Sequence, residues 1–164
     1  MIRSFPPIAD SSSRILILGS MPGVMSLDKK EYYGNPANKF WKIMFAVFGA
    51  PGSDNYRDKL RLLKNNAVAL WDVLESCERE GSLDSEIRNE RPNDIGALVK
   101  KYPGIRCLLF NGKSVAKLFK KHHGADTLPG LEARILPSTS PAHAVSFEVK
   151  YAEWKRVIGE CLGG

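Results

Sequence analysis

The sequence predicts an α/β protein, a three-layer α/β/α sandwich around a central, mostly parallel sheet of four strands. Short β-branched and apolar runs alternate along the chain with segments of helical periodicity. This alternation is typical of a parallel sheet that helices cover on both faces. The chain has 164 residues and shows no internal repeat or low-complexity linker. We therefore expect a single domain, 1–164, with one full hydrophobic core.

Four short apolar segments are the predicted strands. The clearest covers residues 14–18, where an unbroken run of isoleucine and leucine ends at Gly19. Such a run is typical of a strand that is buried on both faces. The other strands are expected at residues 67–73, 106–110 and 134–136.

Five helices are expected between and after these strands. In the first, Trp41, Phe45 and Phe48 have the spacing of one apolar helix face. The third is expected to begin with Asn93 as its cap. The expected helices cover residues 41–48, 54–64, 92–102, 113–121 and 147–161. Residues 1–13, which hold two adjacent prolines and three serines, are expected to form a loose N-terminal arm.

The charge of the chain favours a nucleic-acid partner. The net charge is +6 and the pI is near 9.3, and a basic domain attracts polyanions; a solvated basic surface without a partner is the alternative. No apolar run approaches the ~20 residues of a membrane helix, and the N-terminus lacks a secretory signal. The three cysteines are odd in number and widely spaced, which favours the reducing cytoplasm.

Small and polar residues gather in the loops after the predicted strands. Ligands of open parallel sheets bind outside the carboxyl ends of the strands. The first such loop begins with residues 19–23, Gly-Ser-Met-Pro-Gly, whose small side chains let the backbone approach a ligand closely. A plain tight turn is the alternative. The loops of interest follow Leu18, Asp72, Phe110 and Leu136.

Two tyrosines and an asparagine continue the first loop. Tyr32 and Tyr33 precede a turn with glycine and proline, and they could provide a stacking platform for a base. Asn38 comes just before a predicted helix, and local sequence favours a helix cap over a catalytic role. Asp72, at a strand end, is either a reactive group or a carboxylate that accepts backbone hydrogen bonds.

The third and fourth loops could bind phosphates. Lys113 stands at a strand-to-helix junction, although a nucleotide-binding P-loop would need a glycine where the chain has Cys107. Residues 137–143 place three hydroxyl side chains close to two prolines, and hydroxyls can bind DNA phosphates. The alternatives are an exposed lysine and a turn that caps the last helix.

Together these loops resemble the uracil-DNA glycosylase superfamily, with a match that runs from Arg14 to about Trp154. Residues 19–23 look like its first motif, and residues 137–141 look like its second. Asn-Lys-Phe-Trp at residues 38–41 resembles a segment of the mismatch-specific uracil and thymine glycosylases, as does Phe-Asn-Gly-Lys at residues 110–113.

The deoxyinosine, or hypoxanthine, branch is the most similar part of the superfamily. The resemblance to it lies in residues 20–23, 70–74 and 81–85. Many superfamily members have Asn or Asp where this chain has Met21, and many uracil enzymes have His where it has Leu136. Both departures fit the deoxyinosine branch. The iron–sulfur members need four cysteine ligands, and this chain has three cysteines.

The resemblance implies a monofunctional DNA glycosylase that flips a deaminated base, hypoxanthine first, out of single- or double-stranded DNA and hydrolyses its N-glycosidic bond. We expect a monomer with no metal, organic cofactor or membrane partner. The expected catalytic residues are Asn38, which matches the family's asparagine, and Asp72 as the second candidate. The expected base-binding residues are Ser20, Met21, Pro22, Gly23, Tyr33, Asp72 and Asn111. The expected DNA contacts are Lys113, Ser138, Thr139, Ser140, Ala142 and His143.

Three alternatives stay open. A mismatch-specific uracil or thymine glycosylase would use the same loops. A non-catalytic module that recognises damaged DNA would bind with strong salt dependence and release no base. A hydrolase of free nucleotides would need neither a basic surface nor the DNA wedge that we expect around Ala142 and His143.

Overall fold

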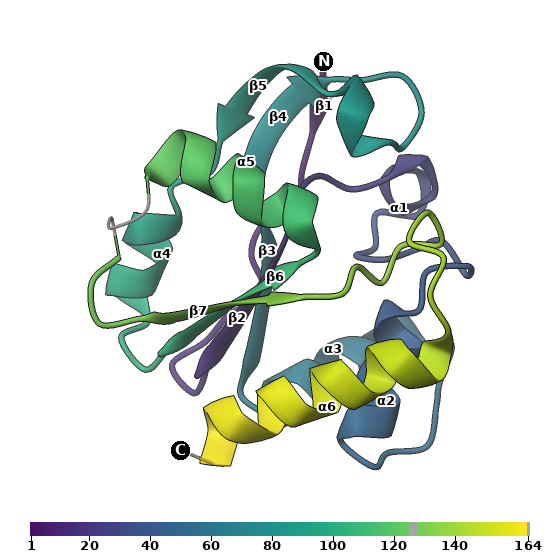
Figure 1. Ribbon diagram of the computed structural model, residues 1–164, viewed down its shortest axis with the longest axis vertical. Helices are drawn as coiled ribbons and strands as arrows, with labels where there is room; N and C mark the ends of the chain where they lie inside the picture. The colour runs from purple at the N-terminus through teal and green to yellow at the C-terminus, as the bar shows by residue number, and fades with distance from the viewer. Residues whose placement is uncertain (125–127, 164) are drawn as a thin grey trace.

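A parallel sheet of four strands forms the centre of the computed structural model, which describes residues 1–124 and 128–163 (Figure 1). All three strand pairs are parallel, so the carboxyl ends of the four strands meet at one edge. The three-layer fold with a four-stranded parallel sheet is therefore confirmed. In spatial order the strands are β3 (Val68–Asp72), β2 (Ile15–Gly19), β6 (Cys107–Asn111) and β7 (Glu132–Leu136).

Side chains of β2 alternate between two separate apolar cores. Ile15 and Ile17 pack into one core, whereas Leu16 and Leu18 pack into the other. All four side chains are completely buried. Successive side chains of a strand point to opposite faces, so a strand covered on both faces needs an unbroken apolar run. This explains why β2 was the clearest strand in the sequence.

Three helices cover the first face of the sheet. They are α2 (Phe40–Val47), α3 (Tyr56–Asn65) and α6 (Phe147–Gly163). The side chain of Asn55 caps α3 by accepting backbone hydrogen bonds from its first turn. Trp154 of α6 is fully buried, and its indole N–H donates to the Pro137 carbonyl over 2.9 Å. Thus α6 anchors the loop that follows β7.

Two helices, α4 (Ile95–Lys101) and α5 (Lys113–His123), cover the second face (Figure 1). The α4 helix begins later than expected, because Asp94 and not Asn93 caps it. Asn93 instead donates from Nδ2 to the carbonyls of Asp72 and Leu74. None of the helices in the described residues has the length and hydropathy of a membrane span.

A second, antiparallel sheet beside this core was not predicted. Its strands are β1 (Ile2–Arg3), β4 (Leu74–Glu78) and β5 (Arg88–Pro92), in the order β1-β4-β5. The β5 sequence, Arg-Asn-Glu-Arg-Pro, has no apolar side chain other than proline. This segment forms a strand because it pairs with β4, since its own sequence shows no hydrophobic periodicity. The short helix α1 (Val24–Lys29) and a 3₁₀ turn at Asp84–Glu86 were also missed.

The N-terminal segment is attached to the domain, so the expectation of a loose arm at residues 1–13 was wrong. Strand β1 pairs with β4, and Ile8 forms a bridge with Leu70. The residues between β1 and Ile8 are held through their carbonyl groups. The Phe5 carbonyl accepts the Trp71 indole N–H at 3.0 Å, and the Pro6 carbonyl accepts the Tyr32 hydroxyl at 2.7 Å. Prolines lack an N–H group, but the backbone carbonyls here remain good acceptors.

We predict that Trp154→Phe lowers the free energy of unfolding by about 1–3 kcal/mol. The change removes the N–H donor from the buried Pro137 carbonyl and leaves a void in the core. Urea unfolding followed by circular dichroism measures the effect. Tyr151→Phe, on a less buried side of the same helix, should change the value by less than about 0.5 kcal/mol. Equal stability of Trp154→Phe and the parent protein would contradict the anchoring role.

Candidate active site

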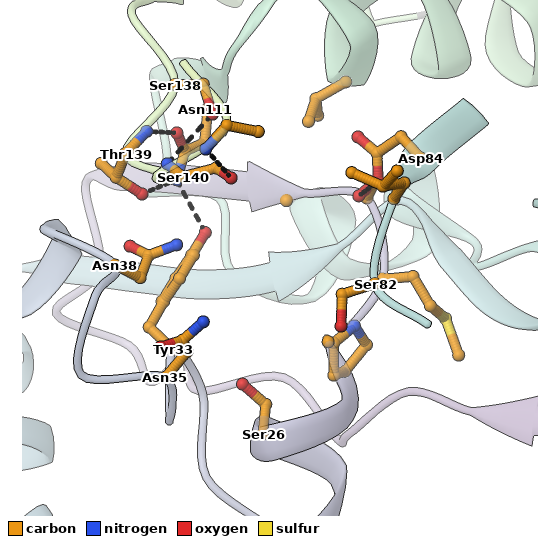
Figure 2. A pocket seen from close by; sticks show the side chains of 18 of the residues that line it. Ser26, Tyr33, Asn35, Asn38, Ser82, Asp84, Asn111, Ser138, Thr139 and Ser140 are labelled. Atoms are coloured by element: carbon orange, nitrogen blue, oxygen red, sulfur yellow. Dashed lines mark hydrogen bonds between the residues drawn. The ribbon is translucent and has the colours of Figure 1, made fainter. Parts of the chain in front are cut away.

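A cavity of about 530 Å³ opens at the carboxyl edge of the parallel sheet. Loops that follow β2, β3, β6 and β7 line it, together with the segment between β4 and β5. Figure 2 shows the segment with Ser82 and Asp84 on one side and the loop with Ser138 and Ser140 on another. The predicted residues that line the cavity are Ser20, Met21, Pro22, Gly23, Tyr33, Asn38, Asp72, Asn111, Ser138, Thr139, Ser140, Ala142 and His143.

Strand register brings these loops together. Gly19 at the end of β2 is paired with Asp72 at the end of β3, and Asn111 is paired with Leu136. A Cβ atom at position 19 would lie only 2.6 Å from Asp72 Oδ1. The absence of a side chain at Gly19 is therefore what leaves room for the Asp72 carboxyl group at this edge.

The Asp72 carboxyl group is buried and incompletely paired. Within the described residues, its Oδ2 atom is shielded from solvent and has no hydrogen-bond partner. Burial, with a smaller contribution from nearby Asp84 and against the opposing charge of Arg79, raises the pKa of Asp72 from 3.8 to about 7. Near neutral pH both protonation states are accessible, so this group can donate or accept a hydrogen bond in the cavity.

Asp84 joins three parts of the cavity wall, and the sequence analysis gave it no role. Its two carboxylate oxygens accept hydrogen bonds from Ser20 Oγ at 2.6 Å and from Ser114 Oγ at 2.7 Å. Ser82, two residues earlier, accepts the Val24 N–H at 2.9 Å. The segment lies within residues 81–85, which we had quoted for the resemblance without a function. Its partners are distant in sequence, so no local pattern revealed them.

Asn111 connects the sheet to two other parts of the cavity. Its Nδ2 group donates to Tyr33 Oη at 3.0 Å and to Thr139 Oγ1 at 2.9 Å, and its Oδ1 accepts the Thr139 N–H at 2.9 Å. Both amide hydrogens and one lone pair of the oxygen are therefore engaged, so one lone pair of Oδ1 is left as an acceptor. Thr139 is completely buried in this structure, and its hydrogen bonds with Asn111 hold the loop after β7. Its contact with DNA stays a prediction.

Tyr33 stacks on Phe40, with ring centroids 4.0 Å apart and an angle of 17° between the planes. Phe40 covers one face of the tyrosine ring, and the same tyrosine lines the cavity. Its φ of 53° is in the left-handed region, which is uncommon for a non-glycine residue. Burial and the nearby Asp72 raise the pKa of the Tyr33 hydroxyl, so it stays neutral. The sequence-based expectation of a stacking platform fits this geometry.

Asn38 supports the start of α2 and also lines the cavity, although Lys39 and not Asn38 is the N-cap residue of this helix. Its Oδ1 accepts the Phe40 N–H at 2.9 Å, at the start of α2. The residue also lines the cavity, and Figure 2 shows its amide group beside the Tyr33 ring. An amide oxygen has two lone pairs, so one remains for a ligand or a water molecule. The hydrogen bond to the helix start fixes the orientation of the side chain.

The loop after β7 is shaped by its own hydroxyl groups. Ser138 Oγ accepts the Ser140 N–H, and Ser140 Oγ accepts the Ala142 N–H, each at 3.2 Å. The buried ammonium group of Lys150 donates to the Ser140 carbonyl at 3.1 Å. The loop is thus held in place before any ligand arrives, while Ala142 and His143 are exposed at its tip.

Two groups lie outside the cavity. Lys113 is exposed at the start of α5 and does not line the cavity. In the described ranges, Cys107, Glu132 and Cys161 have ligand atoms within 4.8 Å of one another and could hold a metal ion. Cys107 and Glu132 begin β6 and β7, at the opposite end of the sheet from the cavity. Burial raises the pKa of the Cys161 thiol to about 12.

Comparison with known proteins identifies the family. A model of the uracil DNA glycosylase superfamily matches residues 6–158. The chain belongs to this superfamily. It is therefore a DNA glycosylase, a hydrolase that cleaves N-glycosidic bonds in DNA, and the prediction from its loops is confirmed. The basic charge agrees with a DNA substrate.

Relatives within the superfamily cover nearly the whole chain. A protein of Methanosarcina acetivorans named hypoxanthine DNA glycosylase is 38% identical over 157 residues, which are 95% of this chain and 97% of the relative. One of the same name from Methanosarcina barkeri is 37% identical over 153 residues, 93% of this chain and 94% of the relative. The solution NMR structure of a uracil DNA glycosylase candidate from M. acetivorans is 36% identical, covers 97% of both chains and has a TM-score of 0.81.

We predict that Gly19→Ala disturbs the superfamily's first-motif loop and destabilises the protein by about 1–3 kcal/mol. The new methyl group would approach Asp72 Oδ1 to 2.6 Å, so the carboxyl group or the strand end must move. Urea unfolding measures the stability. Gly52→Ala is the control, because a Cβ at Gly52 meets no atom within 4 Å. Equal effects of the two changes would rule out crowding at Asp72.

The raised pKa of Asp72 predicts a pH-dependent stability. Between about pH 4 and pH 7 the folded state holds a proton that the unfolded state has lost, so the free energy of unfolding should fall as pH rises and level off above about 7. Asp72→Asn should flatten this decline. Urea unfolding from pH 4 to pH 9 tests it. If the free energy of unfolding of Asp72→Asn falls with pH as steeply as that of the parent protein, another group controls the pH dependence of stability.

Proposed function

We propose that this glycosylase flips deoxyinosine out of DNA and hydrolyses its N-glycosidic bond, releasing hypoxanthine without cutting the strand. The observation that carries the proposal is the meeting of Asn38, Tyr33 and the buried Asp72 in one cavity. The 38% identity to a hypoxanthine DNA glycosylase over 95% of the chain supports hypoxanthine as the base. A base inside a duplex is out of reach, so the enzyme must extrude it into such a cavity.

Tyr33 would stack on the extruded base. Its ring is held on one side by Phe40 and through its hydroxyl by Asn111, so a base meets a rigid aromatic surface. Stacking on an aromatic ring depends little on which base is stacked. The choice among bases must therefore come from contacts with the polar edge of the base, for which Asp72 and the loop of residues 20–23 line the cavity. The second lone pair of the Asn111 oxygen, beside the one that accepts the Thr139 N–H, would add an acceptor there.

Asn38 would position the water molecule that attacks the sugar. Its oxygen is oriented by the Phe40 N–H and keeps one lone pair for water. Bond cleavage gives the sugar cationic character, and such a carbon needs only a weak nucleophile that is well placed. Asp72 is the second candidate for this task. Its carboxyl group and the Tyr33 hydroxyl both lie close to Gly19, a position that suits contact with the base equally well.

DNA would lie across the cavity mouth, with its phosphates on the hydroxyl loop. Ser138 and Ser140 sit on a loop that their own hydrogen bonds stiffen, and exposed Lys113 extends the basic surface beside it. We further propose that the enzyme acts as a monomer in the cytoplasm. Light scattering of the purified protein, with and without DNA, tests the oligomeric state.

A panel of labelled oligonucleotides tests the activity. Each carries inosine, uracil, xanthine or a G·T mismatch, and hot alkali after incubation reveals abasic sites. We expect release from inosine to be the fastest. Preference for uracil or thymine would favour a mismatch-specific glycosylase, and DNA binding with no release would favour a non-catalytic module. Inhibition by mononucleotides without DNA affinity would favour a free-nucleotide hydrolase.

Asn38→Ala should lower the single-turnover rate of base release by at least about 100-fold, because no amide oxygen then orients the attacking water molecule. The same change removes the acceptor of the Phe40 N–H at the start of α2, so lost activity alone is ambiguous. Asn38→Ser is the control, since serine can still accept a backbone N–H two residues on but lacks the amide. It should unfold near the parent midpoint and remain as inactive as Asn38→Ala. An active Asn38→Ser protein would leave Asn38 with a structural role alone.

A further inference from the structure

Two cysteines and a glutamate meet at the end of the sheet that is opposite the cavity. Within the described ranges, the Sγ atoms of Cys107 and Cys161 and a carboxylate oxygen of Glu132 all lie within 4.8 Å of one another. We call these three residues the thiol–carboxylate cluster. They are far apart in the sequence, so no spacing of ligands along the chain predicted the cluster. The candidate active site does not use it either, since none of the three residues lines the cavity.

Strand register and the last helix build the cluster. Cys107 is the first residue of β6, and it is paired in register with Glu132, the first residue of β7. Residues paired in this way point to the same face of a sheet. Cys107 is buried in the core on that face, and Cys161, near the end of α6, packs against the same core. The cluster therefore joins two strands and one helix.

An arginine orients the carboxylate of the cluster. Arg134 Nη1 donates to Glu132 Oε1 at 2.9 Å, whereas Glu132 Oε2 lies 3.8 Å from Cys107 Sγ. Arg134 is itself fixed, because its Nη2 lies 2.9 Å from Glu160 Oε2 on α6. Partners that hold a ligand from behind in this way are a regular part of metal sites. Two thiolates and a carboxylate carry three negative charges, which a divalent cation and the neighbouring guanidinium group would balance.

We propose that the thiol–carboxylate cluster binds one Zn²⁺ ion, with a water molecule as the fourth ligand. Zinc accepts thiolate and carboxylate together, whereas Mg²⁺ and Ca²⁺ take oxygen ligands. Tetrahedral zinc, with bonds of about 2.3 Å to sulfur and about 2.0 Å to oxygen, places its ligand atoms about 3.5–3.8 Å apart. The separations in the cluster, at most 4.8 Å, need only a small contraction to reach these values. Glu132 is exposed and Cys161 is half-buried, so the water molecule can enter from solvent.

The bound ion would hold α6 against the sheet. Near its other end, this helix carries Lys150 and Trp154, which donate hydrogen bonds to two carbonyls of the loop after β7. A metal that binds only the folded state raises its stability. Zinc would thus stabilise the helix that supports this loop, and its place at the far end of the sheet keeps it out of bond cleavage. The proposal departs from the sequence-based expectation of no metal.

The experiment uses the full chain, freed of metal by a chelator and kept reduced by a phosphine. We expect Co²⁺, a spectroscopic substitute for Zn²⁺, to produce thiolate-to-cobalt absorption that saturates at one ion per chain and disappears when Zn²⁺ displaces it. Zn²⁺ should raise the thermal unfolding midpoint. It should also protect Cys107 and Cys161 from iodoacetamide, which mass spectrometry of peptides measures for each cysteine.

Two variants test the ligands. Cys161→Ser should abolish most of the cobalt absorption. Glu132→Gln, at an exposed position that folding tolerates, should weaken Zn²⁺ binding at least about tenfold, since even groups that only orient a metal ligand contribute that much. Glu75→Gln is the matched control, because Glu75 is an equally exposed glutamate that pairs with Arg3 in the other sheet. It should leave Zn²⁺ binding unchanged.

Three results would overturn the proposal. The first is a reduced protein that shows neither the cobalt absorption nor a rise in the unfolding midpoint. The second is metal binding that survives both Cys161→Ser and Glu132→Gln, because the ion would then lie elsewhere. The third is a reduced protein that binds no metal while air oxidation joins Cys107 to Cys161, which would make the cluster a redox pair.

Discussion

The side-chain amide of Asn111 is the contact on which the active-site geometry depends. From the end of a central strand, it holds the Thr139 backbone and hydroxyl and the Tyr33 hydroxyl through three hydrogen bonds. One residue thus fixes the position of the loop after β7 relative to the Tyr33 side chain. Buried networks in which each member is satisfied specify one arrangement strongly. The sheet supplies a rigid base for this amide because β6 is paired on both sides.

Locally encoded features could be predicted from the sequence, whereas features set by distant partners could not. The four parallel strands are apolar runs, and the helices are periodic, so both appear without knowledge of the fold. Strand β5 is polar, and pairing with β4 defines it. The same reason explains Asp84, whose hydrogen-bond partner Ser20 is 64 residues away. The position of Asn38 before a helix indicated its bond to the helix start, although Lys39 is the N-cap residue. Its catalytic role comes from the resemblance and stays a prediction.

Three locally unfavourable features share the wall of one cavity. Tyr33 has a left-handed backbone conformation, Asp72 has a buried carboxylate oxygen without a partner, and Leu83 exposes an apolar side chain to water. Each costs folding free energy, and the two well-packed cores offset that cost. Departures of this kind from local rules are typical of functional sites. Their coincidence here supports this cavity as the candidate active site.

The attachment of the N-terminal segment has a consequence for the order of folding during synthesis. Ile2 and Arg3 leave the ribosome before their partners Cys77 and Ser76, which follow more than seventy residues later. The loop closed by this pairing is long, and its closure entropy delays the contact. The nascent segment must therefore remain unpaired until β4 emerges, and the bond from the Tyr32 hydroxyl to the Pro6 carbonyl then holds it near the cavity. A chaperone that binds the unpaired segment would compete with this late step.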